Sequence, residues 1–328
     1  MLNAGICGFG ALGHVHANSL SKLDGVAVKA VCDINPAQLS ATEVKFNIAA
    51  EQGAFDVKTA TPYLDFAQML AREKLDLVVI TTPTNLHADY SIMALDAGCH
   101  VFCEKPMSLS VEDCDRVIAA RDRNRRQLMI GQCIRFWPEY EYLQACIQDG
   151  RYGKLQSLMM ERNASYHVEG SWFNDHKRSG GAILDLHVHD VDWALSALGR
   201  PDKITARGVI GQTGGVDDIT SIWQYGSSTI LTIRGSWMYS GFRMGYTAFF
   251  ENATVEYHPG TNIGFKVSQL WKGAIPGIQI PQESGYFREM RYFLECLRGE
   301  HANTRCTPES TRQSIQTALM ERAMCLGR

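Results

Sequence analysis

The start of the chain limits its possible folds more than any other stretch, because an apolar run passes directly into a glycine-rich loop. The run "NAGIC" is followed by "GFGALG", in which Gly8, Gly10 and Gly13 form a G-x-G-x-x-G pattern. These glycines permit a tight turn, close approach of backbone amides to a pyrophosphate, and close packing of a helix on a strand. The alternative is a structural turn in a domain that binds no nucleotide. The expected dinucleotide contacts of this loop are Gly8, Phe9, Gly10, Ala11, Leu12 and Gly13.

Short apolar runs alternate with amphipathic stretches up to about residue 131. The runs "NAGICG", "VAVKAVC", "LDLVVIT", "HVFCE" and "QLMIG" are typical of strands, and "NLHADYSIMALDAG" and "SVEDCDRVIAARDRN" have the helical period. Strands that are apolar on both faces, with helices between them, indicate a parallel, doubly wound sheet. The segment 45–66 is less regular, and only a short strand near Val57 is expected there. Residues 1–131 are therefore predicted to form a Rossmann domain that binds NAD(P).

The pattern changes beyond residue 132. Stretches such as "QSLMMERNAS", "TSIWQYG", "STILTIRGSW" and "GYTAFFENATVEYH" alternate and are separated by Gly, Ser and Asn. This is typical of an antiparallel sheet with one covered face. Two helices are expected at 284–298 and 308–325. The predicted fold class is thus α/β, with a C-terminal α+β domain at 132–328 that contains a large, mostly antiparallel open sheet and serves substrate binding and oligomerisation.

Composition narrows the choice of partners and location. Lys and Arg total 32 against 35 Asp and Glu, and a net charge of -3 argues against nucleic acid or an anionic membrane as a partner. No apolar run is long enough to cross a bilayer, and the first strand begins too early for a signal peptide, so a cytoplasmic location is expected. Ten cysteines without a CxxC pair favour buried, reduced thiols over disulfides or a zinc site.

An acidic residue at the end of the second predicted strand bears on the choice of cofactor. Asp33 lies twenty residues after Gly13, where a carboxylate can accept hydrogen bonds from the adenosine ribose hydroxyls. An acid at this position repels a 2′-phosphate, and no basic residue follows directly in "DINPAQ". NAD is therefore favoured over NADP. The alternative is that Asp33 is a solvated loop acid.

Two further loops follow predicted strands at the same edge of the sheet. Open parallel sheets bind ligands at the carboxyl ends of their strands, so we expect both loops to line the cofactor groove. Pro83 is equally consistent with a simple helix start, whereas Pro106 stiffens the turn after the fifth strand. The expected cofactor contacts in these loops are Thr81, Thr82, Pro83, Asn85, His87, Glu104 and Lys105.

The segment "ILDLHVHDVD" raises the question of a metal site, because it has two histidines one residue apart. On a strand, His187 and His189 would share a face and could bind one ion, whereas on a helix they point apart. The apolar residues recur at intervals of three and four, which predicts a helix over 185–198. Asp185, His189 and Asp192 then share one face, and His187 points elsewhere. No metal is predicted.

At this point the sequence resembles the glucose-fructose oxidoreductase and inositol dehydrogenase (Gfo/Idh/MocA) family. The resemblance rests on "GFGALGHVH", "TPTNLHADYSIMALDAGCHV", "CEKP", "SGGAILDLHVHDVD" and the closing "ESGYFREMRYFLECLRGE" and "TPESTRQSIQTALMERA". It implies a sugar or polyol pocket in the second domain, with Lys105 and Asp185 binding substrate and His189 as the catalytic base. It also implies a cis Lys105–Pro106 bond. The sequence departs from the family pattern at Ala182 and at His187, where glycine is more common.

The residue types agree with the roles that the resemblance implies. Oxidising a secondary alcohol requires a base for the hydroxyl proton, and a histidine can accept a proton near neutral pH. Lys105 can hydrogen-bond the same oxygen and stabilise its developing charge. The alternative for Asp185 and His189 is a helix-start acid and a core histidine. The loop before them supplies Trp172, Asn174 and His176, whose side chains are suited to contacts with a sugar. Asp175 and Lys177 in the same loop are equally consistent with solvated surface charges. Arg135 is expected to be structural.

The predicted function is an NAD-dependent oxidoreductase that acts on a secondary alcohol of a cyclic polyol, sugar or glycoside. A second possibility is an enzyme that keeps its cofactor and uses transient oxidation for epimerisation or bond cleavage. A third is a dinucleotide-sensing regulator, which would not need Lys105, Asp185 and His189 together. A homodimer or homotetramer is expected to form through the second sheet, with "SIWQYG" and "STILTIRGSWMY" supplying apolar surface.

Overall fold

The computed structural model describes residues 1–41, 53 and 55–327, and the chain divides into two compact units. Unit 1 comprises Met1–Phe136 and Glu283–Gln313, and unit 2 comprises Trp137–Gln282 and Ser314–Arg328. A segment late in the chain, Glu283–Gln313, is thus part of the same unit as the N-terminus. The domain boundary expected between residues 131 and 132 stays a prediction.

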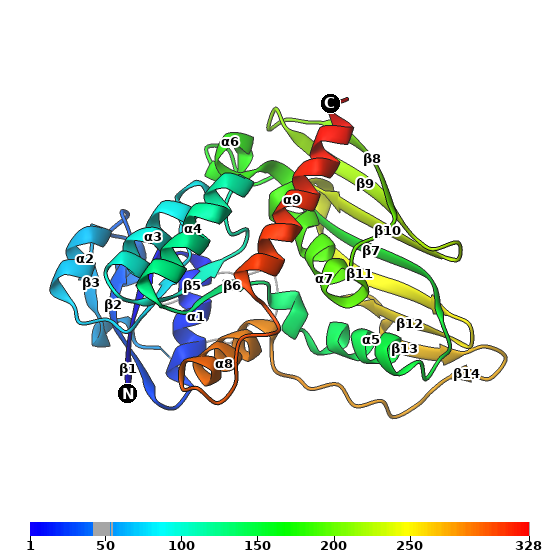
Figure 1. Cartoon of the computed structure of the whole chain (residues 1–328), viewed down its shortest axis with the longest axis horizontal. Coiled ribbons are helices and arrows are strands. Elements are labelled where there is room, and N and C mark those ends of the chain that lie inside the picture. Colours follow the sequence, from blue (N-terminus) through cyan, green and yellow to red (C-terminus); the bar gives the residue numbers. More distant parts are fainter. Residues whose placement is uncertain (42–52, 54, 328) are drawn as a thin grey trace. The chain divides into compact units, whose positions relative to one another are not determined.

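Unit 1 is built on a six-stranded sheet in which all strands are parallel (Figure 1). The strand order is β3-β2-β1-β4-β5-β6, the arrangement of a doubly wound Rossmann sheet, which confirms the predicted fold class. Its strands are β1 (Leu2–Cys7), β2 (Val26–Cys32), β3 (Thr61–Tyr63), β4 (Leu77–Ile80), β5 (His100–Glu104) and β6 (Leu128–Gly131). Its helices are α1 (Ala11–Ser21), α2 (Phe66–Arg72), α3 (His87–Asp96), α4 (Val111–Asn124) and α8 (Gly285–Leu297).

The prediction of a short strand near Val57 is wrong by a few residues. Val57–Thr59 forms a 3₁₀ turn, and β3 begins at Thr61. The Asp56 side chain accepts a hydrogen bond from the Lys58 amide at 3.0 Å, which satisfies the start of the turn and competes with extension. Most of the irregular segment before it, residues 45–52 and 54, lies outside the described residues.

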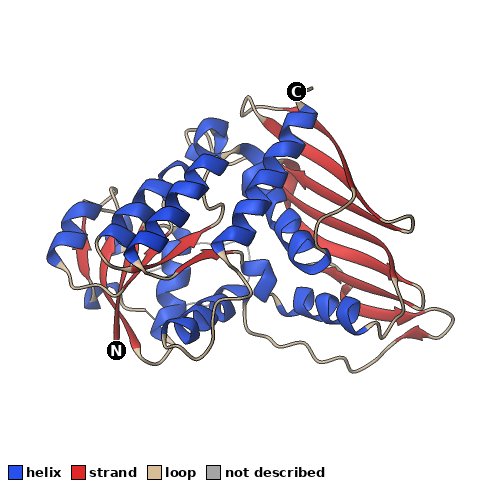
Figure 2. Cartoon of the chain, in the orientation of Figure 1, coloured by secondary structure: helices blue, strands red, loops and turns tan. Residues whose placement is uncertain are grey.

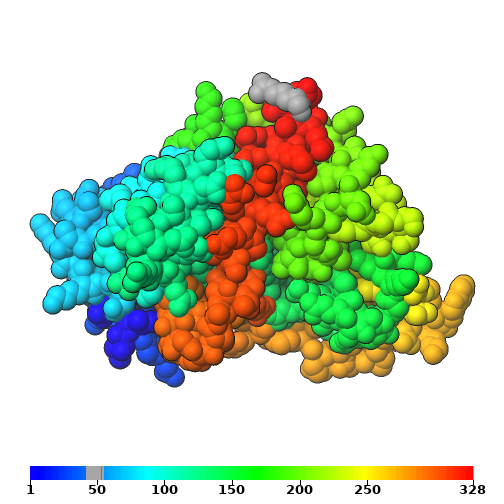
Figure 3. All heavy atoms as spheres, viewed as in Figure 1, coloured from blue at the N-terminus to red at the C-terminus, as the bar shows by residue number. Residues whose placement is uncertain are grey.

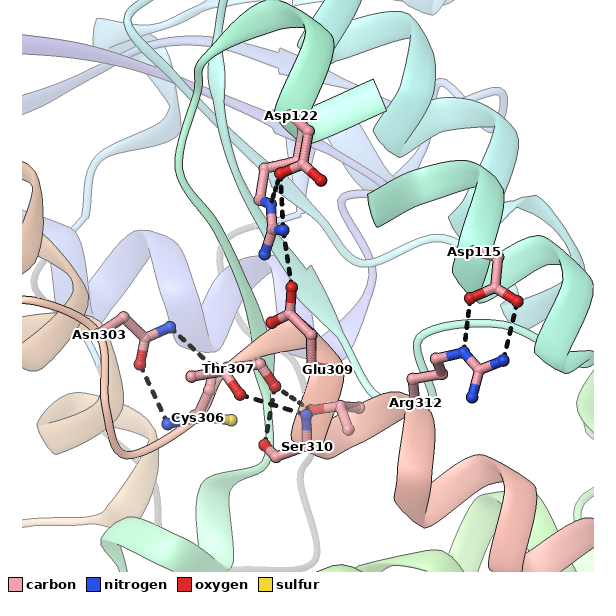
Figure 4. A network of polar contacts seen from close by, with 10 residues as sticks. Asp115, Asp122, Asn303, Cys306, Thr307, Glu309, Ser310 and Arg312 are labelled. Carbon is pink, nitrogen blue, oxygen red and sulfur yellow. Dashed lines mark hydrogen bonds and ion pairs between the residues drawn. The ribbon is translucent and has the colours of Figure 1, made fainter. Parts of the chain in front are cut away.

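Helix α9 (Pro308–Cys325) begins in unit 1, where polar contacts connect its first turns to α4 (Figure 4). Arg312 makes a two-pronged contact with Asp115, at 2.5 and 2.9 Å, and Arg121 contacts Glu309 at 2.7 Å. Exposed ion pairs of this kind contribute only about 0–1 kcal/mol each. Their effect is therefore to orient the helix start more than to stabilise the unit.

Unit 2 is built on an eight-stranded sheet in the order β14-β13-β12-β11-β7-β10-β9-β8. Only β7 and β10 pair in parallel among the described strands of this sheet, so the prediction of a mostly antiparallel sheet is confirmed. Its strands are β7 (Leu155–Ser165), β8 (Lys203–Ile210), β9 (Val216–Tyr225), β10 (Thr229–Ser236), β11 (Met238–Phe250), β12 (Ala253–His258), β13 (Gly264–Gln269) and β14 (Gly273–Ala274).

The longer helices of unit 2 lie on one face of this sheet (Figure 2). They are α5 (Pro138–Asp149), α7 (Val188–Leu198) and the later part of α9, and the unit also contains the short helix α6 (His176–Ser179). The outward side of α9 lies at the surface, as Figure 3 shows, while its Ser314, Ala318 and Glu321 are fully buried. The other face of the sheet carries no helix among the described residues and exposes Met159, Ile222, Ile230 and Phe249. The alternation predicted from the sequence therefore marks a covered and an open face.

The core beneath the helices of unit 2 combines large aromatic side chains with a buried ion pair. Tyr140 packs edge-on against Trp193 and Tyr246, and all three are at most 1% exposed. Beside them Arg162 Nε lies 3.1 Å from Asp190 Oδ2, and both side chains are buried. Burial raises the pKa of Asp190 despite the opposing effect of Arg162. A carboxylate in this position depends on its cationic partner.

Two expectations from composition can be compared with the structure. All ten cysteines are free and nine are buried, as predicted. No helix in the described part of the chain combines the length and apolarity required to cross a bilayer.

A buried polar cluster lies in unit 1 between α1, β5 and α8. His16 Nε2 is 2.6 Å from Glu104 Oε1, and an oxygen of Glu289 lies within 4.8 Å of both groups. Neither Glu289 oxygen has a hydrogen-bond partner among the described residues. Burial, reinforced by the Glu104 carboxylate, raises the pKa of Glu289 well above its usual value of 4.5. The Glu289 carboxyl group therefore keeps its proton to a higher pH in the folded than in the unfolded state.

This raised pKa predicts a pH-dependent cost to stability. A carboxyl group whose pKa is higher in the folded than in the unfolded state contributes stability below about pH 4.5, and that contribution is lost as the pH rises toward its folded value. The side chain of Glu289→Gln does not titrate. We therefore expect the Tm of this variant to rise relative to that of the wild type as the pH increases from 5 to 9. A change of about 1 kcal/mol in the free energy of unfolding shifts the Tm of a unit of this size by roughly 2–4 °C.

The measurement is thermal unfolding at several pH values, with the exposed Glu300→Gln as the matched control. The Glu300 side chain is 52% exposed, so its substitution should leave the difference from the wild type independent of pH. A Tm difference for Glu289→Gln that does not change with pH would show that Glu289 is not protonated on folding.

Candidate active site

The glycine loop after β1 owes its shape to two very close backbone contacts. Gly8 has φ +92°, and a Cβ there would lie 2.6 Å from the backbone of Thr81 and Thr82. A Cβ on Gly13 would lie closer still to the carbonyl oxygen of Gly8. These two positions therefore require glycine so that α1 can pack against β1 and β4. Gly10 differs, because among the described residues no atom beyond its chain neighbours lies within 4 Å of its ideal Cβ.

The space beside Gly10 is suited to a pyrophosphate. Gly10 caps α1 with its backbone alone, and the first turn of α1 contains no acidic residue, so its amides can bind an anion. The Phe9 side chain is fully buried and its amide donates to Asp33 Oδ2 at 2.8 Å, so a direct contact of Phe9 with cofactor stays a prediction. Asp33 Oδ1 accepts from the Asn35 amide at 2.8 Å. The Asp33 carboxylate is thus fixed at the end of β2, next to the loop.

His87 connects the loops that follow β4 and β5. Its Nδ1 lies 2.7 Å from the carbonyl oxygen of Pro106, and its Nε2 lies 2.8 Å from that of Thr82. Burial lowers the pKa of His87, although both carbonyl contacts oppose this shift. A neutral ring has one N–H and donates to only one of the two carbonyls. His87 is 2% exposed, so the structure places it beneath these loops, and a direct contact with cofactor stays a prediction.

The remaining predicted cofactor residues lie around the same edge of unit 1. Thr81 donates from its hydroxyl to the carbonyl of Gly8, and Asn85 is exposed. Glu104 is buried, with Oε2 accepting from the Lys105 amide at 3.1 Å, so it supports the turn from below. The Lys105–Pro106 peptide bond is cis, as the resemblance implied. Ala11, Leu12, Thr82 and Pro83 are partly exposed.

In unit 2 the segment that carries Asp185 and His189 differs from the predicted regular helix. Ile183–His187 forms a π turn, and the α-helix α7 begins only at Val188. Asp185 Oδ2 accepts a hydrogen bond from Trp237 Nε1 at 3.1 Å, and His189 is 7% exposed. π turns interrupt helices mainly where an irregular geometry is required, often at functional sites.

His187, predicted to point away from Asp185 and His189, lies inside unit 2 against α9. It is fully buried, and its Nε2 lies 2.8 Å from Glu321 Oε2 in α9. Asp192, predicted to share a face with Asp185 and His189, is also fully buried and accepts from the Ser314 hydroxyl at 2.7 Å. Two of the polar groups in "ILDLHVHDVD" thus bind α9.

The loop before the π turn makes many of its hydrogen bonds within itself. The Asn174 side chain bonds the backbone of His167 and Val168, and Asp175 caps α6. His176 Nδ1 lies 2.8 Å from the Thr213 carbonyl oxygen. Trp172 stacks on Phe173, with ring centroids 3.8 Å apart. Substrate contacts by Trp172, Asn174 and His176 therefore stay predictions.

Arg135 has the structural role expected from the sequence. Its Nη1 donates to the carbonyl of Arg305 at 2.7 Å and to the Ser310 hydroxyl at 3.0 Å. Its side chain is buried in unit 1 and connects the end of the Rossmann sheet to the start of α9.

A pocket of about 800 Å³ lies next to Asp185 in unit 2, and the sequence did not predict it. Trp237 both lines this pocket and donates to Asp185. Its lining combines aromatic and polar side chains without a charged group, a composition that is common in small-molecule sites. The lining residues are Ser165, Tyr166, Gly211, Gln212, Trp237, Met238, Tyr239 and Ser240. The only signal in the sequence was the aromatic run "GSWMYS" after a predicted strand.

The chain matches two family models, one for each half of the sequence. Residues 2–132 match the model of an oxidoreductase family with an NAD-binding Rossmann fold, and residues 140–256 match the Gfo/Idh/MocA C-terminal domain. The chain belongs to the Gfo/Idh/MocA oxidoreductase family. The Rossmann match supports NAD as the cofactor, and the glycine loop, the α1 N-terminus with its non-acidic first turn, and Asp33 fit it.

Individual members of the family show the same relationship. The inositol 2-dehydrogenase of Rhizobium meliloti is 31% identical over 239 residues, covering 71% of this chain and 68% of that protein. That of Salmonella typhimurium is 33% identical over 200 residues, or 60% of this chain and 55% of its own length, so the match spans about half of that relative. The aldose-aldose oxidoreductase of Caulobacter crescentus shares the fold, with a TM-score of 0.83 at 21% identity, covering 100% of this chain and 98% of that one.

The contrast between Gly10 and Gly13 yields a test of the cofactor site. We expect Gly10→Ala to fold with an unchanged Tm but to bind NADH at least about tenfold more weakly, because its Cβ enters the space kept for the pyrophosphate. Gly13→Ala should lower the Tm, because its Cβ meets the Gly8 carbonyl. Thermal unfolding and NADH fluorescence titration measure both effects. Wild-type NADH affinity in Gly10→Ala would place the dinucleotide elsewhere.

Proposed function

We propose that this protein is an NAD-dependent dehydrogenase, or a reductase in the reverse direction, for a secondary alcohol of a cyclic polyol, sugar or glycoside. The observation that carries the proposal lies in unit 2, where Asp185 and His189 occur on a π turn and the helix after it, next to an uncharged aromatic pocket. The glycine loop of unit 1 supplies the complementary dinucleotide site. Inositol 2-dehydrogenases among the relatives support the substrate class.

The roles proposed for individual residues follow from their chemistry. His189 accepts the hydroxyl proton, Asp185 accepts a hydrogen bond from a substrate hydroxyl, and Lys105 stabilises negative charge on the reacting oxygen. The nicotinamide of bound NAD supplies the hydride acceptor. The hydrogen bond from Trp237 orients the Asp185 carboxylate. NAD is proposed over NADP because Asp33 would repel a 2′-phosphate.

Enzyme assays with purified protein test this proposal. We expect NADH formation at 340 nm with a member of a panel of inositols, aldoses and glycosides, and a loss of at least about 10²-fold in kcat for His189→Ala, since general-base catalysis typically contributes 10²–10⁴-fold. Ser196→Ala, at an exposed position of α7, is a control that should keep the wild-type activity.

An absence of NADH formation would contradict net dehydrogenation. If NAD is then released on denaturation, the retained-cofactor alternative gains support. If no nucleotide is released and none binds, the protein is not an enzyme of this kind.

We further propose that the open face of the unit 2 sheet forms a homodimer or homotetramer interface. In adjacent strands Thr232 pairs with both Ile222 and Met159, which places these two apolar side chains in one row across the face. They are 50% and 54% exposed, and large exposed apolar patches commonly mark interfaces. Trp223 and Trp237, from the stretches expected to supply this surface, are instead fully buried.

A charge placed within the apolar row tests the interface. We expect Met159→Glu to shift the mass measured by light scattering from an oligomer toward the monomer, because the carboxylate would be desolvated on association. Val168→Glu, at a loop position that is 81% exposed, is the matched control and should keep the wild-type mass. A wild-type protein that is monomeric at micromolar concentration would contradict the proposal.

A further inference from the structure

The π turn of unit 2 must be held in place by contacts from outside the helix. A π turn is closed by i→i+5 hydrogen bonds and is rare in proteins. It therefore persists only where contacts with the surrounding structure hold it. This turn contains Asp185, and His189 follows two residues after its last residue, His187. A contact that fixes His187 therefore also fixes the backbone from which Asp185 and His189 extend.

His187 makes such a contact through a buried chain of hydrogen bonds. Its Nε2 lies 2.8 Å from Glu321 Oε2, and Glu321 Oε1 accepts from Trp223 Nε1 at 2.6 Å. All three residues are fully buried, and they come from the π turn, α9 and β9 of unit 2. Both oxygens of the Glu321 carboxylate are thus bonded. Because an unpaired buried carboxylate is costly, this arrangement strongly favours one position of the turn.

The two ring nitrogens of His187 have different surroundings. Its Nδ1 is buried and has no hydrogen-bond partner in the part of the chain that the structure describes. Its Nε2 faces the Glu321 carboxylate, which can only accept, so the N–H that makes this hydrogen bond is on Nε2.

Strand β10 supports the same turn from the other side. A Cβ on Gly235 would lie 2.8 Å from the Cβ of His187 and 3.1 Å from its Cα, so the strand backbone packs directly against the turn. Two residues further on, Trp237 donates to Asp185. The turn is therefore enclosed between α9 and β10, and a shift of His187 is expected to change the Trp237–Asp185 hydrogen bond.

We propose that His187 and Glu321 are positioning residues, whose buried hydrogen bond fixes the π turn and thereby directs Asp185 and His189. This rests on the proposed function, in which those two residues bind substrate and accept the proton. Helix α7 has further anchors in the Asp190–Arg162 pair and in the bond from Ser314 to Asp192. Loss of the His187–Glu321 bond is therefore expected to displace the turn while the helix remains folded.

Kinetics of matched variants provide the first test. We expect His187→Ala to lower kcat by about tenfold to a hundredfold, the range expected for misplaced reacting groups, with an unchanged KM for NAD. His187→Gln keeps a side-chain N–H donor toward Glu321 and should retain at least about a third of the wild-type kcat. Ser196→Ala, at an exposed position of α7, is the control and should behave as the wild type.

A spectroscopic measurement does not depend on finding the substrate. With ¹⁵N-indole labelling, the six tryptophans give separate N–H signals, and Trp223→Phe and Trp237→Phe identify two of them. We expect His187→Ala to shift the Trp237 signal, and His187→Gln and Ser196→Ala to leave it in place. If His187→Ala does not fold, Glu321→Gln provides the same test, because it keeps an acceptor for Trp223 but presents an amide N–H₂ to His187.

The two measurements separate this inference from the proposed function. A shifted Trp237 signal in a protein that oxidises no substrate and binds no NAD would support the positioning of the turn and refute the proposed function. An active wild type whose His187→Ala variant keeps both kcat and the Trp237 signal would overturn the positioning role. Reduced thermal stability alone, with kcat unchanged, would likewise reduce His187 and Glu321 to a purely structural role.

Discussion

The dinucleotide edge of unit 1 depends on the close backbone approach of Gly8 to Thr81 and Thr82. With side chains at Gly8 or Gly13, β1, β4 and α1 could not pack this closely, and the α1 N-terminus would move away from the sheet. Of the three loop glycines, Gly10 is the one beside which the described residues leave open space. Because all six strands are parallel, Asp33, Thr81 and Lys105 then follow strands that end at one edge.

Buried polar links determine how the loops at these edges are oriented. In unit 1, His87 joins the loops after β4 and β5, and Glu104 bonds both His16 and the Lys105 amide. In unit 2, the Arg162–Asp190 pair and the His187–Glu321 bond have a similar role. Such groups are costly to bury unless they are bonded, so they exclude alternative packings more strongly than apolar contacts do.

Local patterns predicted much of the fold, since they depend on neighbouring residues alone. The run "VAVKAVC" is β2 from first to last residue, and the helix expected at 308–325 is α9. Helix α5 was not predicted, and the π turn was expected to be regular helix, because its geometry depends on α9 and β10. The glycine loop was evident as a motif. In contrast, Trp237 and Asp185 are 52 residues apart, and His187 and Glu321 are 134 apart, so no local pattern reveals these pairs.

The histidine at position 187 and the glutamate on α9 are best understood together. A glycine at 187, as the resemblance would suggest, would give the π turn backbone freedom but no donor for Glu321 Oε2. Of the two donors to the buried Glu321 carboxylate in this chain of contacts, only Trp223 Nε1 would then be left. The second carboxylate oxygen would lose its hydrogen bond, which is costly in a buried position. The β10 backbone lies close to the Cα and Cβ of His187, and Gly235 permits that approach because it has no side chain. The geometry of the turn in this chain is therefore a property of His187, Glu321 and Gly235 jointly, and not of the helix sequence that contains Asp185 and His189.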